Sequence, residues 1–414
     1  MTVAMVPAGA AKFTMNLIDP ILQFHDELTR IRREIHAHPE LAYEEVKTSE
    51  LVASKLEEWG IPVIRGLGKT GVVGVIKGGS GERAVGLRAD MDALPLQEHN
   101  TFDHKSRHDG RMHACGHDGH TAMLLGAAHH LAKHRDFDGT VYVIFQPAEE
   151  GGGGAKQMID DGLFVQCPME AVFGMHNWPG MTAGAMGVVA GPMMASSNEF
   201  ELTIHGKGSH AAQPHMSVDP VMVAVQIAQS WQTIVSRNAN PLDAAVLSIT
   251  QIHTGSATNI IPDSAHMVGT VRTFTLPALD LIERRMQEIA AHTSAAFGAS
   301  IEFEFRRNYP PLLNHAPETE FALQVMKEVV GDDGVKNDIQ PTMGAEDFAF
   351  MLLEKPGCYV FIGNGDGMHR ESGHGLGPCN LHNPSYDFND SLLPVGASYW
   401  VRLATGFLSR PPLR

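Results

Sequence analysis

The segment MHACGHDGHT, residues 112–121, concentrates side chains that can bind a metal: one thiol, three imidazoles and a carboxylate. Cys115 and His117 are two positions apart, so they share a face only if the backbone is extended. We therefore expect an extended loop capped by Asp118, with Thr121 in the first turn of the apolar helix that follows. A thiolate and an imidazole presented together form half of a metal site. A structural cysteine beside surface histidines would have the same local sequence.

The elements that must position this segment alternate between short apolar runs and helical patterns. This alternation predicts an α/β layer with a substantially parallel sheet. In such sheets, functional sites gather at the carboxyl ends of the strands. The predicted strands are 71–77, 84–88, 141–145 and 358–362, and the predicted helices are 20–38, 45–59, 122–133, 155–161, 318–330, 346–353 and 390–409.

Two of these strands end in acidic clusters. Asp90 and Asp92 follow the run 84–88, and Glu149 and Glu150 follow the run 141–145. Adjacent carboxylates on extended backbone point to opposite sides, so one could bind a metal while the other faces a water. Taken alone, a pair of glutamates is more often a solvated acidic turn.

Two further histidines could join these groups. His176 follows the apolar run 171–173, and His382 lies in a polar loop before the last helix. Each, considered alone, is more often a structural or surface histidine. Taken together, Cys115, His117, Glu150, His176 and His382 offer more donors than one tetrahedral zinc with an open position needs. Two metals sharing a water would use them all, and the thiolate favours zinc or a similar transition metal.

The pattern changes at Gly191-Pro192, where a second set of elements begins. Its expected order, βαββαβ, is that of a ferredoxin-like unit. The expected architecture is a discontinuous catalytic domain, 17–191 and 310–414, with an α+β lid and dimerisation domain inserted at 192–309. Residues 1–16 are expected to be a disordered leader. The elements of the inserted domain are strands at 198–205, 244–253, 265–274 and 300–306 and helices at 219–236 and 278–297.

The composition of the chain limits the classes of partner that it can bind and the cellular compartment that it fits. The net charge of −16 argues against nucleic acid or an anionic membrane surface. No run approaches the roughly 20 apolar residues of a membrane span. Four cysteines without framework spacing fit a reducing cytoplasm better than secretion, and the N-terminus lacks the pattern of a signal peptide.

The chain resembles the M20 metallopeptidase family over nearly its whole length, in particular the amidohydrolase branch of hippurate, N-acyl-amino-acid and indoleacetyl-amino-acid hydrolases. The motifs that carry the resemblance are LRADMDALP, MHACGHDGHTA, FQPAEEG, GMHNWP, GKGSHAAQPH, TNIIPD, GTVRTF and GAEDFAF. The resemblance implies that two metal ions are held by Cys115, His117, Glu150, His176 and His382.

The resemblance also implies that Glu149 is the general base. Peptidase branches usually carry His-x-Asp where this chain has Asp90-Met91-Asp92, and this departure favours the amidohydrolase branch. Asp92 would orient a ligand or tune the base. Which donor bridges the metals does not follow from the sequence; Cys115 is our expectation.

Four residues outside the metal set are expected to contact substrate. By resemblance, His210 donates to the developing oxyanion, often in the active site of a partner subunit. Asn259 and Arg272 are similar to residues that bind the substrate carboxylate, and Gly344 is expected to line the pocket. Without the resemblance, the sequence at His210 would indicate only a polar turn, and Asn259 only a turn-stabilising residue. Arg272 would be an arginine at a strand edge, and Gly344 a residue beside a helix cap. Because His210 is expected to act in the active site of a partner subunit, we expect a homodimer or higher homo-oligomer formed through the lid.

The expected activity is metal-dependent cleavage of N-acyl-L-amino acids to an organic acid and a free amino acid. The nearest alternatives are a dipeptidase or an N-acetyl-diaminopimelate deacetylase of the same family. A catalytically silent metal-binding protein is disfavoured because the candidate base Glu149 accompanies the ligand set. A nucleotide-binding protein is disfavoured because no Gly-x-Gly-x-x-Gly stands between a strand and a helix.

Overall fold

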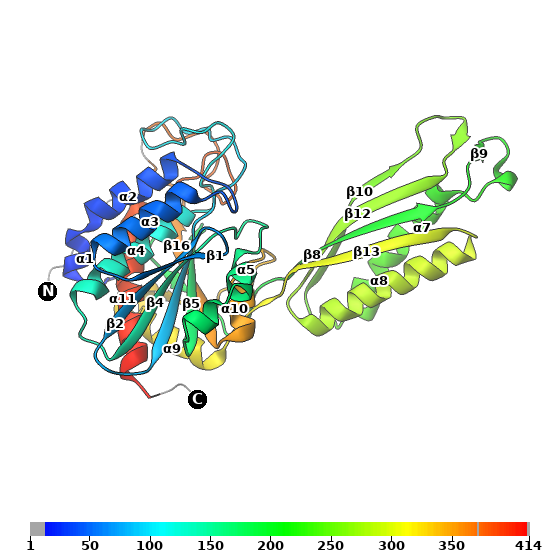
Figure 1. Ribbon diagram of the computed structural model, residues 1–414. Coiled ribbons are helices and arrows are strands. Elements are labelled where there is room, and N and C mark those ends of the chain that lie inside the picture. Colours follow the sequence, from blue (N-terminus) through cyan, green and yellow to red (C-terminus); the bar gives the residue numbers. More distant parts are fainter. Residues whose placement is uncertain (1–12, 371, 412–414) are drawn as a thin grey trace. The chain divides into compact units, whose positions relative to one another are not determined.

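The computed structural model describes residues 13–370 and 372–411, which form two compact units (Figure 1). The first unit runs to Gly191 and also contains Leu313–Gln340 and the chain from Phe350 onward. The second unit consists of Pro192–Leu312 and Pro341–Ala349. Residues 341–349, which we expected in the first unit, therefore cluster with the second.

The expected leader falls partly outside the described residues, which begin at Phe13. Phe13 and Met15 pack against the core of the first unit. The backbone N–H of Asn16 donates to the carbonyl of Val329 at 2.7 Å. The expectation of disorder is therefore wrong for residues 13–16.

An eight-stranded mixed sheet organises the first unit, in the order β1-β2-β4-β3-β5-β16-β6-β15. The central strands β4, β3, β5 and β16 are parallel, so their carboxyl ends share one edge. Strand β3 is buried along its whole length, as expected for a strand covered on both faces. The strands are β1 (Val63–Leu67), β2 (Gly71–Gly78), β3 (Ala84–Asp90), β4 (Gly139–Gln146), β5 (Ala171–Pro179), β6 (Met186–Gly187), β15 (Val335–Lys336) and β16 (Gly357–Gly365).

Helices flank this sheet, so the expected α/β class with a mixed sheet is confirmed. Helices α4 and α11 pack against each other and against β3, and α2 lies on α4. The helix expected at 20–38 is two helices, separated at Phe24. The helices are α1 (Asp19–Gln23), α2 (His25–Ala37), α3 (Val46–Glu58), α4 (His117–Lys133), α5 (Gly154–Asp160), α6 (Leu163–Gln166), α9 (Ala316–Val330), α10 (Ala349–Glu354) and α11 (Leu393–Ser409).

The second unit is a four-stranded antiparallel sheet, β10-β12-β8-β13, with two helices packed on it. With its βαββαβ element order, this is the ferredoxin-like arrangement. Asp219 caps α7 by accepting from the N–H of Val221 at 2.9 Å, and Pro220 occupies the first turn. The elements are β8 (Ser197–His205), α7 (Pro220–Thr233), β10 (Ala245–Thr254), β12 (Ser264–Thr273), α8 (Leu276–Ala296) and β13 (Ser300–Tyr309), with the short strands β9 (Ser209–His210) and β11 (Ile260–Ile261).

Short strands lie where the chain first enters the second unit and where it first returns to the first unit, β7 (Gly191–Met194) and β14 (Leu312–Asn314). Among the described residues, every helix is too short or too polar to cross a membrane.

Candidate metal centre

The segment Cys115–His117 leads directly into α4. Gly116 precedes the helix with φ of 89°, a left-handed conformation that glycine adopts without strain, and α4 begins at His117. Asp118 therefore lies inside the helix rather than capping it, and its carboxylate bonds to His36 at 2.8 Å. That expectation was wrong because the glycine, not the aspartate, ends the loop. The Sγ of Cys115 lies 3.3 Å from Nε2 of His176 on β5.

The turn after β4 brings both glutamates to the same place. Ala148 has φ of 55°, so the backbone here is not extended. The N–H groups of Glu149 and Glu150 donate to the two carboxylate oxygens of Asp92, at 3.0 and 2.9 Å. Ligand atoms of Glu149, Glu150 and His117 all lie within 4.8 Å of one another. The expectation that the two carboxylates point to opposite sides is therefore wrong.

His382 completes the cluster from the C-terminal part of the chain. Its φ of 57° is unusual for a residue with a side chain, and its N–H donates to the carbonyl of Ala114 at 2.8 Å. Its Nε2 lies 3.2 Å from Oε1 of Glu150. Ligand atoms of Cys115, Glu150 and His382 lie within 4.8 Å of one another. All five expected metal ligands thus meet at the carboxyl edge of the sheet.

Hydrogen bonds fix which ring nitrogen each buried histidine presents. Nδ1 of His117 donates to the carbonyl of Asp92 at 2.9 Å, and Nδ1 of His176 donates to that of Asn177 at 2.6 Å. Both rings therefore offer Nε2 to the cluster, as metal-binding histidines commonly do. Nε2 of His117 is buried and has no hydrogen-bond partner in the described structure, which is costly unless a cation occupies the site.

The carboxylates around the cluster also create an electrostatic environment that favours a bound cation. Burial and neighbouring carboxylates, Glu150 foremost, raise the pKa of the Cys115 thiol well above its usual range. Burial disfavours charge on His117, but the carboxylates of Asp90 and Asp92 outweigh it and raise its pKa to about 10. Divalent cations bind deprotonated thiolate and neutral imidazole, so loading this site releases protons. Sulfur, nitrogen and oxygen donors together suit zinc or a similar transition metal.

Sequence reasoning missed the role of His120. Its Nδ1 lies 2.6 Å from Oδ1 of Asp90, and its Nε2 accepts the backbone N–H of Asn177 at 2.9 Å. Both nitrogens are occupied, so His120 orders strand β5 beside the ligands rather than binding metal. Its position three residues after His117 was the available signal, because i and i+3 share a helix face.

The second unit holds the expected substrate-contacting residues. Ile260 pairs with His210, and the N–H of Ala211 donates to the carbonyl of Asn259 at 3.0 Å, so His210 and Asn259 lie together. Arg272 lies near the far end of β12, roughly 27 Å along the strand from its start at the antiparallel rise per residue. One chain therefore does not bring Asn259 and Arg272 together.

Arg272 and Gly344 differ in their surroundings. The Arg272 side chain is half-buried, and this burial lowers its pKa despite the nearby Glu199. The carbonyl of Gly344 accepts the N–H of Ala195 at 2.9 Å, which fixes the glycine against the start of the second unit.

Comparisons with known proteins show the family of this chain. Residues 86–406 match the sequence pattern of Peptidase family M20/M25/M40. The chain belongs to this family. It is 42% identical over 396 residues to a hippurate hydrolase of Campylobacter jejuni, covering 95% of this chain and 100% of that protein. It is 39% identical over 383 residues to an N-acetylcysteine deacetylase of Bacillus subtilis, covering 92% and 97%.

A solved structure extends the comparison to the fold. A dinuclear metal-binding peptidase of the M20 family from Bacillus subtilis superimposes with a TM-score of 0.80 at 35% identity. The match covers 94% of this chain and 99% of that one. The resemblance inferred from the motifs is thereby confirmed.

Proposed function

We propose that this M20 protein hydrolyses the amide bond of N-acyl-L-amino acids, hippurate among them, to an organic acid and a free amino acid. Membership of the family and its hydrolase relatives make the chain a metallo-amidohydrolase. The observation that carries the finer proposal is the convergence of Glu149 with five metal donors at one edge of the sheet. A hippurate hydrolase aligned over 95% of the chain supports the choice of substrate class.

The proposed metal ligands are Cys115, His117, Glu150, His176 and His382, holding two divalent ions of which zinc suits the donors best. When bound, such ions lower the pKa of a water and polarise the substrate carbonyl. Manganese, cobalt and nickel are the other candidates.

Glu149 is proposed as the general acid–base. It is 7% exposed and lies on a turn whose backbone is held by Asp92. Its carboxylate accepts a proton from the attacking water and returns it to the leaving amine. Asp92 positions this carboxylate by fixing the two N–H groups of the turn.

The second unit is proposed to recognise the substrate. The Arg272 guanidinium suits a planar carboxylate, Gly344 lines the pocket, and His210 donates to the oxyanion. Because Asn259 lies with His210 and apart from Arg272, we propose that Asn259 and His210 serve a partner subunit in a homodimer formed through this unit. A cytoplasmic location is also proposed, since all four cysteines are buried free thiols.

A second candidate is hydrolysis of N-acetyl amino acids or dipeptides by the same centre, favoured by the deacetylase relative. Side-by-side assays with hippurate, N-acetyl amino acids, N-acetyl-diaminopimelate and dipeptides separate these substrates.

The test of the mechanism is Glu149→Ala. We expect it to abolish turnover and to keep the bound metal, because Glu149 is assigned to proton transfer and Glu150 to coordination. A variant with near-wild-type kcat would remove Glu149 from the mechanism.

A further inference from the structure

Asn177, next to the ligand His176, contacts the backbone of the other ligand segment. Its Nδ2 donates to the carbonyl of Cys115 at 2.6 Å and lies 3.1 Å from Nε2 of His120. A carbonyl can only accept, so the amide nitrogen must face Cys115. The amide oxygen of Asn177 then points the other way, toward the hydroxyl of Tyr386, which donates to it at 2.8 Å.

Gly116 rests on the same pair of side chains. A Cβ at this position would collide with both the amide of Asn177 and the hydroxyl of Tyr386. The segment between Cys115 and His117 is therefore packed onto the Tyr386–Asn177 pair with no space for a methyl group. Two metal ligands flank that glycine, so a shift of the pair would move both.

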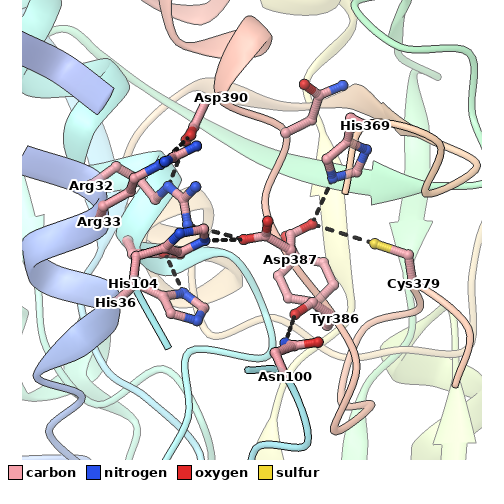
Figure 2. Close-up of polar contacts among 12 residues, drawn as sticks. Arg32, Arg33, His36, Asn100, His104, His369, Cys379, Tyr386, Asp387 and Asp390 are labelled. Atoms are coloured by element: carbon pink, nitrogen blue, oxygen red, sulfur yellow. Dashed lines mark hydrogen bonds and ion pairs between the residues drawn. The ribbon is translucent and has the colours of Figure 1, made fainter. Parts of the chain in front are cut away.

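The backbone at Tyr386 is held by the polar cluster in Figure 2. Its carbonyl accepts Nδ2 of Asn100 at 2.9 Å. The carboxylate of the next residue, Asp387, accepts from Arg32 at 3.0 Å and bonds to His104 at 3.2 Å. These groups are all buried. The cluster thus fixes the backbone from which the Tyr386 hydroxyl reaches Asn177.

Burial raises the pKa of Tyr386 well above its usual range, so the hydroxyl keeps its proton and remains a donor at neutral pH. Without that donor, the oxygen of Asn177 would be a buried acceptor lacking this partner, which is unfavourable. Rotation of the amide to find another partner would release the carbonyl of Cys115.

We propose that Tyr386 is a positioning residue of the metal centre: its hydroxyl orients Asn177, which holds the Cys115–His117 segment in the geometry that binds metal. In this arrangement Tyr386 acts through Asn177 and is not itself a metal ligand. The inference rests on the proposed function, because it concerns the same centre, but its readout is metal affinity and not turnover.

The test compares Tyr386→Phe with Tyr399→Phe in the full chain. Tyr399 on α11 is also fully buried, but its hydroxyl has no hydrogen-bond partner among the residues that the structure describes, so its loss is a matched control. Each protein is stripped with a chelator and titrated with Zn²⁺ in competition with a chromophoric chelator. Loss of an outer hydrogen-bond partner typically weakens metal binding 10–100-fold. We expect Tyr386→Phe to raise the Zn²⁺ Kd at least about tenfold, and Tyr399→Phe to leave it within about twofold.

The thermal stability of the metal-free proteins is measured alongside, because a purely structural role would lower Tm without changing Kd. An unchanged Kd in Tyr386→Phe, or an equal rise in Tyr399→Phe, would overturn the proposal. If Tyr386→Phe does not fold, Asn177→Asp provides the second variant, since it keeps the acceptor for Tyr386 but loses the donor to Cys115. It is expected to raise the Kd similarly, and an unchanged value would also refute the idea.

Failure of the proposed function gives a different result. A wild-type protein that binds Zn²⁺ but cleaves no amide would remove the function and still allow the comparison of Kd values. If the wild type hydrolyses the amide but all variants bind Zn²⁺ with the same Kd, the proposed function stands and only the role of Tyr386 is refuted.

Discussion

Replacement of Asp92 by Asn tests how the turn that carries the general base is held. The carboxylate of Asp92 accepts the N–H groups of Glu149 at 3.0 Å and Glu150 at 2.9 Å, one on each oxygen. An asparagine can accept on only one oxygen, and its NH₂ group would face the other N–H. The variant therefore loses one charge-assisted hydrogen bond and leaves one buried donor unpaired.

A hydrogen bond to a charged group contributes about 1.5–3 kcal/mol. If misplacement of Glu149 raises the activation free energy by about 2 kcal/mol of this, kcat falls roughly 30-fold, since 1.36 kcal/mol is a factor of ten in rate. KM should change little, because Asp92 is not assigned to substrate binding. The assay is steady-state hydrolysis of hippurate at saturating Zn²⁺, with metal content and Tm measured on the same preparations. A kcat within twofold of wild type, with full metal content, would show that these bonds do not position the base.

Two further predictions concern recognition and pH. Arg272→Ala should raise KM about 10-fold or more for substrates with a free carboxylate while leaving kcat nearly unchanged, because a charge-assisted hydrogen bond is lost. If the variant and the wild type have the same KM for hippurate, this role is refuted. Burial disfavours charge on His36, but Asp118 and Glu98 outweigh it and raise its pKa to about 10 from an ordinary 6.5. The stabilisation is therefore complete below about pH 6.5 and is lost as the pH rises toward 10. The Tm difference between wild type and His36→Gln should shrink across that range, and a constant difference would contradict the assignment.

Several of the segments that meet at the proposed site could be predicted from local sequence signals, whereas His382 lies in a polar loop without such a signal. Strands of β-branched and apolar residues end at Asp90 and before Glu149, and parallel strands present their carboxyl ends at one edge. The same reasoning recovered the order of the second unit. Local patterns thus predicted which segments meet.

The orientation of side chains within those segments was not accessible. Ala148 and His382 adopt positive φ, which neither residue type favours, and tertiary hydrogen bonds hold them there. A propensity-based interpretation assigned extended backbone to the glutamate pair for this reason. Asn177 and Tyr386 lie 209 positions apart, and their hydrogen bond has no local signal in the sequence.

The most direct test of the central claim is hippurate hydrolysis by the purified protein after chelation and readdition of Zn²⁺, Mn²⁺, Co²⁺ or Ni²⁺, with metal content determined in parallel. The account predicts no activity in the stripped protein, benzoate release on readdition, and about two metals bound per chain. A stripped protein that binds no metal under any condition would contradict the metal centre. Two bound metals without cleavage of any N-acyl amino acid would contradict the proposed reaction.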